Sequence, residues 1–344
     1  MSAEENVHGS GPKGGRLRLV LLGSLLLCSP AFARTHVQQV IAAYEPLRKH
    51  PELFDARAGW RQWMDPALLE ALDTKNVSAL TRLLRKEIEH TDSSGVYSFQ
   101  LFNDEFCKMF LEELDNYRAS GLPIDRPNSM NNYGIIVNNI GMQPALSWLQ
   151  RSAMQPIAGL LFPTQALEGQ GFDGHHSFMV QYKAGQDLGL DMHTDDSDVT
   201  FNVCLGRNFT GATLTVCGDS RMPDHRKFFA TYEHVVGRCL VHLGSRRHGA
   251  DDIRTGERNN LIIWNSNTAY RRSAKYVNNQ PYHKEADVPD PRCLSYTHDR
   301  DFGQFLDYPP GKKEGGGWCP PAFACYDSMA PALSQGAQRR HDEL

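Results

Sequence analysis

The 344-residue sequence has no strong excess of charge of either sign, no obvious internal repeat and no apolar run of the length that crosses a membrane. Its formal net charge is −4, with 22% charged and 40% hydrophobic residues. Such a balance points neither to a nucleic-acid partner nor to disorder. We therefore expect a globular protein with no nucleic-acid partner, long enough for one large domain or two smaller ones.

A short apolar run, Leu19–Cys28, lies near the N-terminus. Basic residues precede it, and the small residues Ala31 and Ala33 follow it. This order is typical of a secretory signal peptide. An uncleaved membrane anchor is the alternative, but a spanning helix needs about 20 apolar residues, roughly twice this run. We predict a signal peptide over residues 1–33 and no stable membrane span once it has been cleaved.

The last four residues, His341-Asp-Glu-Leu344, match the address for retention in the endoplasmic reticulum. A match of four letters is weak by itself, but it coincides with an entry signal at the other end of the chain. The two signals together predict a protein of the endoplasmic reticulum lumen. They also predict a retrieval receptor as a partner, bound through His341–Leu344.

The cysteines fit an oxidising compartment without defining a disulfide framework. Cleavage after Ala33 would remove one of the eight cysteines, and the odd remainder leaves at least one thiol unpaired within the chain. Cys204, Cys217 and Cys239 lie in apolar segments, so we expect them to be plain core residues. Cys319 and Cys325 flank two prolines and could close a small loop.

Residues 34–165 carry mainly helical patterns and form an expected N-terminal support region. Ser78 can cap a helix whose apolar positions follow the 3.6-residue period from Leu80 to Ile88. Asn103 is expected to cap the next helix, because its side chain can accept a hydrogen bond from a free backbone N–H group.

Residues 166–272 carry short β-rich segments separated by glycine, asparagine and aspartate, and this is the expected catalytic domain. The predicted strands are Phe178–Tyr182, Val199–Leu205, Ala212–Val216, Val235–Leu243 and Asn260–Trp264. Short strands at this spacing predict a sandwich or a double-sheet jelly roll. The fold class is then α+β, a jelly-roll core with N-terminal flanking helices. Residues 273–344 are polar and rich in proline and glycine, which predicts an irregular C-terminal extension.

The chain contains the same tripeptide twice, as His90-Thr-Asp92 and as His193-Thr-Asp195. Roughly one His-x-Asp pattern is expected by chance in a chain of this composition, so the motif decides nothing alone. The first copy follows an amphipathic helix and is typical of a helix C-terminus. The second lies in β-type sequence, where alternate residues face one side, so His193 and Asp195 can converge on one ion. An exposed acidic loop is the alternative at this position.

A third ligand is expected on a later strand, with an anion-binding residue shortly after it. His242 and His248 compete for this role. His242 lies inside an apolar run, whereas His248 precedes Gly249 and stands ten residues before Arg258. We favour His248, and we expect His242 to be a packed core residue or a neighbour of the ligands. Two imidazoles and one carboxylate leave the other coordination positions of a metal ion open, which is the arrangement of non-haem iron oxygenases.

These residues form an ordered set of motifs, Tyr182-x-x-Gly185, His193-x-Asp195, His248-Gly249 and Gly256-x-Arg258. The set resembles the prolyl and lysyl hydroxylase branch of the Fe(II)/2-oxoglutarate dioxygenases. Two further segments, Arg126–Gly134 and Glu233–Gly237, look like the group named 2-oxoglutarate and iron-dependent oxygenase domain-containing protein 2. The likeness covers roughly Phe99–Arg272.

The resemblance implies a double-stranded β-helix with Fe(II) on His193, Asp195 and His248. It implies that Arg258 pairs with the distal carboxylate of 2-oxoglutarate and that Tyr182 hydrogen-bonds the same co-substrate. O₂ as second co-substrate and dependence on ascorbate are further implications of the branch. Collagen-type members use lysine where this chain has Arg258, so the resemblance does not extend to a collagen prolyl 4-hydroxylase.

The expected function is a dioxygenase that hydroxylates a prolyl or lysyl side chain of luminal proteins and releases succinate and CO₂. A protein or peptide substrate is the expected partner. One alternative is a non-catalytic jelly-roll binding module of the endoplasmic reticulum lumen, but a pure binder needs no metal triad with Arg258. A zinc hydrolase on the same three ligands is another alternative, and it leaves Arg258 without a role.

Overall fold

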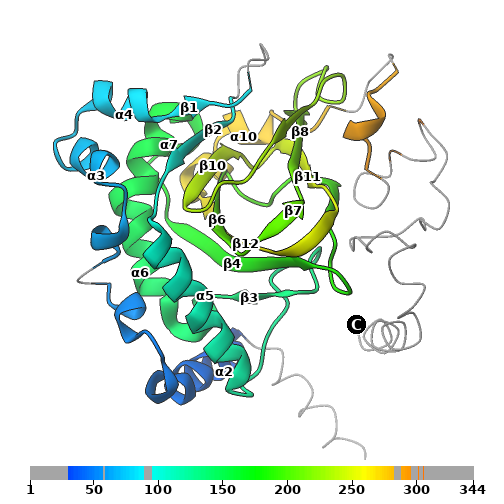
Figure 1. The fold of residues 1–344 in the computed structure, drawn as a ribbon. Coiled ribbons are helices and arrows are strands. Elements are labelled where there is room, and N and C mark those ends of the chain that lie inside the picture. The colour runs from blue at the N-terminus through cyan, green and yellow to red at the C-terminus, as the bar shows by residue number, and fades with distance from the viewer. Residues whose placement is uncertain are drawn as a thin grey trace, which may run out of the picture.

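The computed structural model describes residues 30–56, 59–88, 95–282 and 288–295, together with residues 301 and 305 (Figure 1). The predicted signal segment up to residue 29 and the tripeptide His90-Thr-Asp92 lie outside the described residues. The same holds for Cys319, Cys325 and the terminal His341–Leu344. None of the helices in the described ranges combines the length and the hydropathy that a membrane-spanning helix requires.

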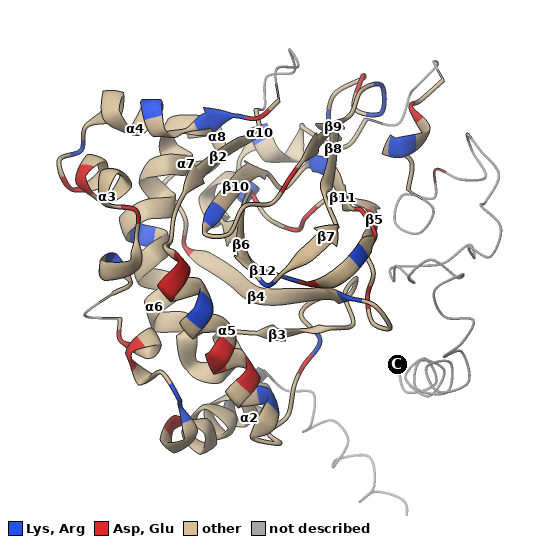
Figure 2. Ribbon diagram, viewed as in Figure 1, with Lys and Arg blue, Asp and Glu red and all other residues tan. Residues whose placement is uncertain are grey.

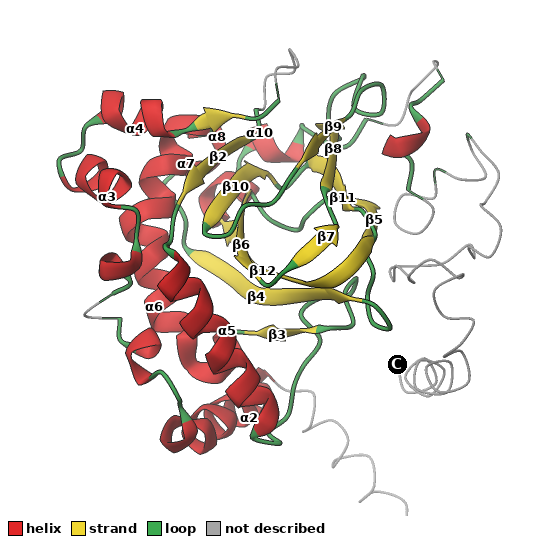
Figure 3. Cartoon of the chain, viewed as in Figure 1, coloured by secondary structure: helices red, strands yellow, loops and turns green. Residues whose placement is uncertain are grey.

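Most of the helices gather on one side of the strands, and the short helical turn Pro291–Cys293 lies on the other side (Figure 3). Charged residues of both signs are spread over these helices and over the loops (Figure 2). The helices before the strand-rich half are α2 (Pro30–Tyr44), α3 (Pro66–Asp73), α4 (Val77–Leu83), α5 (Asp104–Ala119), α6 (Gln143–Leu149), α7 (Gln155–Leu161) and α8 (Pro163–Ala166). After the last long strand follow α9 (Thr268–Arg272) and α10 (Ala274–Val277).

Side-chain caps explain where two of these helices begin. Asn103 accepts a hydrogen bond of 3.0 Å from the backbone N–H of Phe106, as predicted for α5. The predicted cap Ser78 is wrong, because Asn76 accepts the bond from Ala79 and Ser78 lies inside the first turn. The expected helix up to Ile88 is also too long, since α4 ends at Leu83 and the chain pairs as a strand directly afterwards.

The strands form two antiparallel sheets. The strands are β1 (Arg85–Lys86), β2 (Tyr97–Gln100), β3 (Gly134–Ile136), β4 (Gly174–Lys183), β5 (Leu190–His193), β6 (Val199–Gly206), β7 (Phe209–Gly211), β8 (Leu214–Asp219), β9 (Ala230–Tyr232), β10 (Arg238–Leu243), β11 (Arg246–Ala250) and β12 (Ile253–Ser266). The large sheet has the order β1-β2-β10-β6-β12-β4-β3, with β7 paired to β12. The small sheet has the order β5-β11-β8-β9.

The chain passes back and forth between the two sheets. It runs from β4 in the large sheet to β5 in the small one, returns to β6, then enters the small sheet through β8 and β9. It returns to the large sheet at β10, crosses at β11 and ends in the large sheet with β12. This alternation of antiparallel strands is the double-stranded β-helix, so the predicted fold class is confirmed.

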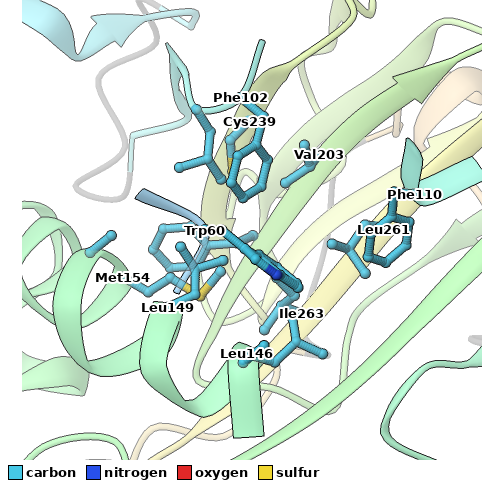
Figure 4. Packing of buried hydrophobic residues seen from close by; sticks show 14 of the residues in the cluster. Trp60, Phe102, Phe110, Leu146, Leu149, Met154, Val203, Cys239, Leu261 and Ile263 are labelled. Carbon is cyan, nitrogen blue, oxygen red and sulfur yellow. The ribbon is translucent and has the colours of Figure 1, made fainter. Parts of the chain in front are cut away.

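The two faces of the large sheet bury different residues because side chains alternate along a strand. Phe201, Val203, Leu261 and Ile263 point outward and join the helices in one hydrophobic core. Trp60 lies within this core, beside residues of α6 and of the sheet (Figure 4). The opposite face, which carries Phe178, Val180, Tyr182 and Ile262, lines the interior of the barrel.

The disulfide between Cys217 of β8 and Cys293 corrects one prediction. Cys217 was expected to be a plain core residue, yet its bond joins it to a residue that lies 76 positions further along the chain. Cys107, Cys204 and Cys239 are free and buried, as expected for Cys204 and Cys239.

Replacing Trp60 by alanine is expected to lower the free energy of unfolding by about 3–5 kcal/mol, because it opens a cavity in the core between helices and sheet. The indole is fully buried, and the rings of Phe102, Phe106 and Phe110 lie 4.9–6.0 Å from it. Urea unfolding measures the loss. The control is Leu47→Ala, at a side chain that is 49% exposed, which should change stability by less than about 0.5 kcal/mol. Equal effects of the two variants would contradict this account of the core.

Candidate metal centre

His193, Asp195 and His248 meet at one point inside the barrel. His193 is the last residue of β5, and His248 lies directly opposite on β11. Asp195 follows two residues after His193, and its Oδ1 lies 3.5 Å from Nε2 of His193 and 3.6 Å from Nε2 of His248. One donor atom from each residue lies within 4.8 Å of the other two. The side chains are 3–6% exposed, so the three donors form a compact, buried group.

Hydrogen bonds fix which atoms of this group face one another. Nδ1 of His193 donates to the carbonyl of Asp191 (2.7 Å), and Nδ1 of His248 donates to the carbonyl of Arg246 (2.9 Å). Each imidazole therefore presents Nε2 with its lone pair, the form that binds a metal ion. The hydroxyl of Thr200 donates to Oδ2 of Asp195 (2.6 Å), which leaves Oδ1 directed at the imidazoles.

The electrostatics favour the metal-binding protonation states. Burial lowers the pKa of His248 to about 3, so this imidazole is neutral. Burial alone would raise the pKa of Asp195, but the neighbouring His248 and His193 outweigh it and hold the pKa well below its usual value. A neutral imidazole and an ionised carboxylate are the species that ligate a divalent cation.

His242 lies beside this group without belonging to it. Its ring centroid is 4.6 Å from that of His248, and its Nδ1 donates to the carbonyl of Leu243. Its Nε2 is buried and makes no hydrogen bond with the described residues. The structure thus places His248, and not His242, among the three converging donors.

Arg258 and Tyr182 line the same pocket as the three donors. Arg258 lies on β12 directly opposite Tyr182 on β4, and its guanidinium carbon is 4.5 Å from the centre of the tyrosine ring. The arginine is 1% exposed and donates to the carbonyl of Ala212. Among the described residues no carboxylate lies within ion-pair distance of it, and its Nε has no hydrogen-bond partner. Burial lowers the pKa of Arg258, but an arginine stays charged in proteins.

A buried cation without an anion is costly, and a ligand anion removes that cost. The guanidinium can meet a carboxylate with two parallel hydrogen bonds. The pocket therefore combines a group of three metal-type donors with a separate site for a negatively charged ligand.

Gly256, two residues before Arg258, has a backbone that other residues rarely adopt, with φ +79°. A Cβ atom there would lie only 1.8 Å from the carbonyl oxygen of Asn208. The glycine of the Gly256-x-Arg258 motif therefore lets β12 approach the neighbouring turn closely, just before it enters the barrel.

Sequence reasoning missed four polar residues of this pocket: Asn128, Asn131, Thr200 and Asn202. Thr200 and Asn202 alternate with apolar residues along β6, and this pattern could have indicated polar positions on an inward face. Asn131 lies far away in the sequence, and its amide donates to the hydroxyl of Tyr182 (3.3 Å). No local signal indicated that Asn131 reaches the pocket.

The chain matches the model of the OGFOD2-like domain over residues 40–166, which is its helical part. It is also similar to the human 2-oxoglutarate and iron-dependent oxygenase domain-containing protein 2. The two are 35% identical over 241 residues, which cover 68% of this chain and 66% of the human protein. The Arabidopsis thaliana 2-oxoglutarate and iron-dependent oxygenase domain-containing protein ICU11 is 36% identical over 192 residues, covering 53% of this chain and 48% of that protein. The chain thus spans slightly less than two thirds of the human relative's length.

Among solved structures, one similar chain is a prolyl hydroxylase from Trichoplax adhaerens, in complex with a peptide fragment of the oxygen degradation domain of hypoxia inducible factor. The alignment has a TM-score of 0.40 at 16% sequence identity and covers 59% of this chain and 92% of that chain.

Replacing Thr200 by valine is expected to weaken metal binding by about 10–100-fold, because Asp195 loses the hydrogen bond that orients it. Titration of the metal-free protein with Co²⁺, followed by visible absorption, measures the affinity. The matched control is Thr194→Val, since the Thr194 hydroxyl makes no hydrogen bond with the described residues. Unchanged affinity in the Thr200 variant would show that this hydroxyl does not hold the carboxylate.

Proposed function

We propose that the chain belongs to the family of 2-oxoglutarate and iron-dependent oxygenases that includes domain-containing protein 2, and that it is an Fe(II)- and 2-oxoglutarate-dependent dioxygenase acting on a protein side chain. One observation carries the proposal. The buried Arg258, which has no carboxylate within ion-pair distance among the described residues, lines the same pocket as the donors of His193, Asp195 and His248. A metal site alone does not require a buried cation, whereas a co-substrate with two carboxylates does.

His193, Asp195 and His248 would hold the iron. Two imidazoles and one carboxylate on one side of Fe(II) leave positions for a chelating co-substrate and for O₂. When bound, iron and 2-oxoglutarate supply O₂ activation and the oxidative decarboxylation that gives succinate and CO₂. The protein's contribution is to fix the three donors, through the carbonyls of Asp191 and Arg246 and the hydroxyl of Thr200.

Arg258 would bind the distal carboxylate of 2-oxoglutarate, and Tyr182 would hydrogen-bond the same molecule. The guanidinium is already held in place by the Tyr182 ring and by the carbonyl of Ala212, so little side-chain freedom is lost on binding. Asn131 in turn orients the hydroxyl of Tyr182. Ascorbate as a supporting reductant is part of the proposal, and turnover that declines when ascorbate is omitted would support it.

The walls of the pocket would keep water from the reacting atoms. Phe178, Val180, Leu190 and Ile262 line it together with the polar residues, and each of these four is at most 9% exposed. An apolar wall excludes water and limits side reactions of an oxidising intermediate. We propose a prolyl or lysyl side chain of a protein or peptide as the acceptor, on the basis of the motif set from Tyr182 to Arg258.

His193→Ala is expected to abolish iron-dependent formation of succinate from 2-oxoglutarate, because one of two imidazole ligands is lost. Succinate is measured by mass spectrometry with luminal protein extracts as the substrate source. The control is His90→Ala in the other copy of the tripeptide, which should retain the activity. Normal turnover by the His193 variant would refute the assignment. Oxidised residues that disappear with His193→Ala would identify the substrate.

Arg258→Gln is expected to raise the KM for 2-oxoglutarate by at least about 10-fold, because a charge-assisted pair of hydrogen bonds becomes a neutral contact. Arg258→Lys keeps the positive charge and should lose less, although it loses the planar fork. Co²⁺ affinity should change little in both variants. An unchanged KM for 2-oxoglutarate in Arg258→Gln would contradict the proposal that this arginine binds the carboxylate.

We propose the lumen of the endoplasmic reticulum as the compartment. The Cys217–Cys293 disulfide supports it, because such bonds persist in oxidising compartments. Asn208 of the acceptor triplet Asn208-Phe-Thr210 is exposed, so it is open to glycosylation. In cells, Asn208→Gln should reduce an endoglycosidase-sensitive mobility shift, and deletion of His341–Leu344 should release the protein into the medium. A chain that is unglycosylated and cytosolic would contradict the proposal.

A further inference from the structure

The segment Val288–Ser295 and Asp301 are attached to the small sheet by buried bonds. Cys293 is joined to Cys217 of β8 by the disulfide, with the two Cα atoms 5.9 Å apart. In Figure 1 the short turn that contains Cys293, drawn in orange, lies beside β8 and β11. Cys217 and Cys293 are fully buried, so the contact belongs to the interior and not to the surface.

Asp301 makes the second attachment. Its carboxylate pairs with Arg247 of β11 at 2.8 Å and with Arg226 at 2.7 Å, and it also accepts a hydrogen bond of 2.9 Å from the backbone N–H of Ser295. Asp301 and Arg247 are each 1% exposed. A buried carboxylate is tolerated only when its oxygens are paired and hydrogen-bonded in this way. The segment is therefore held by a covalent bond and by a fully buried ion pair.

From these anchors the segment reaches both histidines of the metal centre. The hydroxyl of Ser295 donates to the carboxylate of Asp191 (3.0 Å), and the carbonyl of Asp191 accepts the Nδ1 proton of His193 (2.7 Å). On the other strand, Arg247 directly precedes His248 and donates to the carbonyl of Cys293 (2.8 Å). The segment thus contacts the neighbours of both imidazoles, without touching the donor atoms themselves.

We propose that the disulfide-anchored segment Cys293–Ser295 is a positioning element of the metal centre. This role rests on one part of the proposed function, namely that the three donors bind a metal ion. Ser295 holds Asp191, and Asp191 sets the orientation of His193. Partners that orient a ligand in this way typically contribute 10–100-fold to metal affinity. The segment therefore determines how tightly the barrel holds its metal.

The disulfide makes this positioning possible at low entropic cost. Cys293 lies 76 residues after Cys217, and a cross-link over such a distance removes much of the freedom of the unbound segment. Two electrons and two protons open the bond and give two thiols. A phosphine can supply the electrons, becoming a phosphine oxide as water provides the oxygen. Opening the bond should therefore loosen Ser295 and weaken metal binding.

Co²⁺ titration of the full-length, metal-free protein tests the inference by visible absorption. Ser295→Ala and the double variant Cys217→Ser/Cys293→Ser should each weaken Co²⁺ binding by about 10-fold or more. Refolding in the presence of a phosphine reductant, which can reach the buried disulfide only in the unfolded chain, should weaken binding to the wild-type protein similarly and should leave the double variant unchanged. Ser295→Thr keeps a hydroxyl and should restore affinity. Cys239→Ala, at a free and buried cysteine on β10, is the matched control and should bind Co²⁺ normally.

Hydrogen exchange of the metal-free variants separates positioning from general loss of stability. Exchange should rise in Leu190–Asp195 in the Ser295 variant and stay unchanged in α5. Unchanged Co²⁺ affinity in Ser295→Ala and in the double variant would overturn the inference and leave the proposed function standing. The inference would also be overturned if Co²⁺ affinity fell in proportion to the melting temperature in every variant, including Cys239→Ala. Wild-type protein that binds no Co²⁺ would overturn both.

Discussion

The pairing of β5 with β11 is the constraint on which the rest of the site depends. It sets His193 directly opposite His248, so both imidazoles point into the barrel. Because side-chain direction alternates along a strand, a shift of one residue would turn one ligand away. Gly249 permits the pairing, since a Cβ atom there would lie only 3.0 Å from the carbonyl oxygen of Leu190. Thr200, on the facing sheet, then directs the carboxylate of Asp195 toward the same point.

Besides the three metal-type donors, the site needs a cation held inside the apolar barrel, and the large sheet supplies it. Burying the guanidinium of Arg258 without a carboxylate among the described residues costs stability, which the carbonyl of Ala212 and the Tyr182 ring offset in part and an anionic ligand would offset further. The helices close the other face of this sheet, because alternate residues of its strands point outward into the core around Trp60. The part of the chain that matches the family model, residues 40–166, is this helical layer. It also contributes Asn131, which reaches into the pocket to hold Tyr182.

Much of the fold could be predicted from local pattern. The strand from Val199 was recognised as a β-rich segment bounded by Asp198 and Gly206, and α5 because Asn103 has the chemistry of a cap. The predicted cap Ser78 was wrong, because the side chain of Asn76 accepts the bond from the backbone N–H of Ala79 and Ser78 lies inside the first turn. Cys217 was also misjudged, since a disulfide depends on where a distant cysteine lies in space.

The sequence by itself determined the order and spacing of the chemical groups, from Tyr182 through His193, Asp195 and His248 to Arg258. That order was enough to show a resemblance to the Fe(II)/2-oxoglutarate dioxygenases, and the resemblance implied an iron- and 2-oxoglutarate-type site. Only the tertiary structure decided that three donors lie within 4.8 Å of one another and that His248, not His242, is among them. It also decided that Thr200 and Ser295 support them. These contacts join elements far apart in sequence, and their distances depend on strand register and sheet packing, which local pattern does not encode.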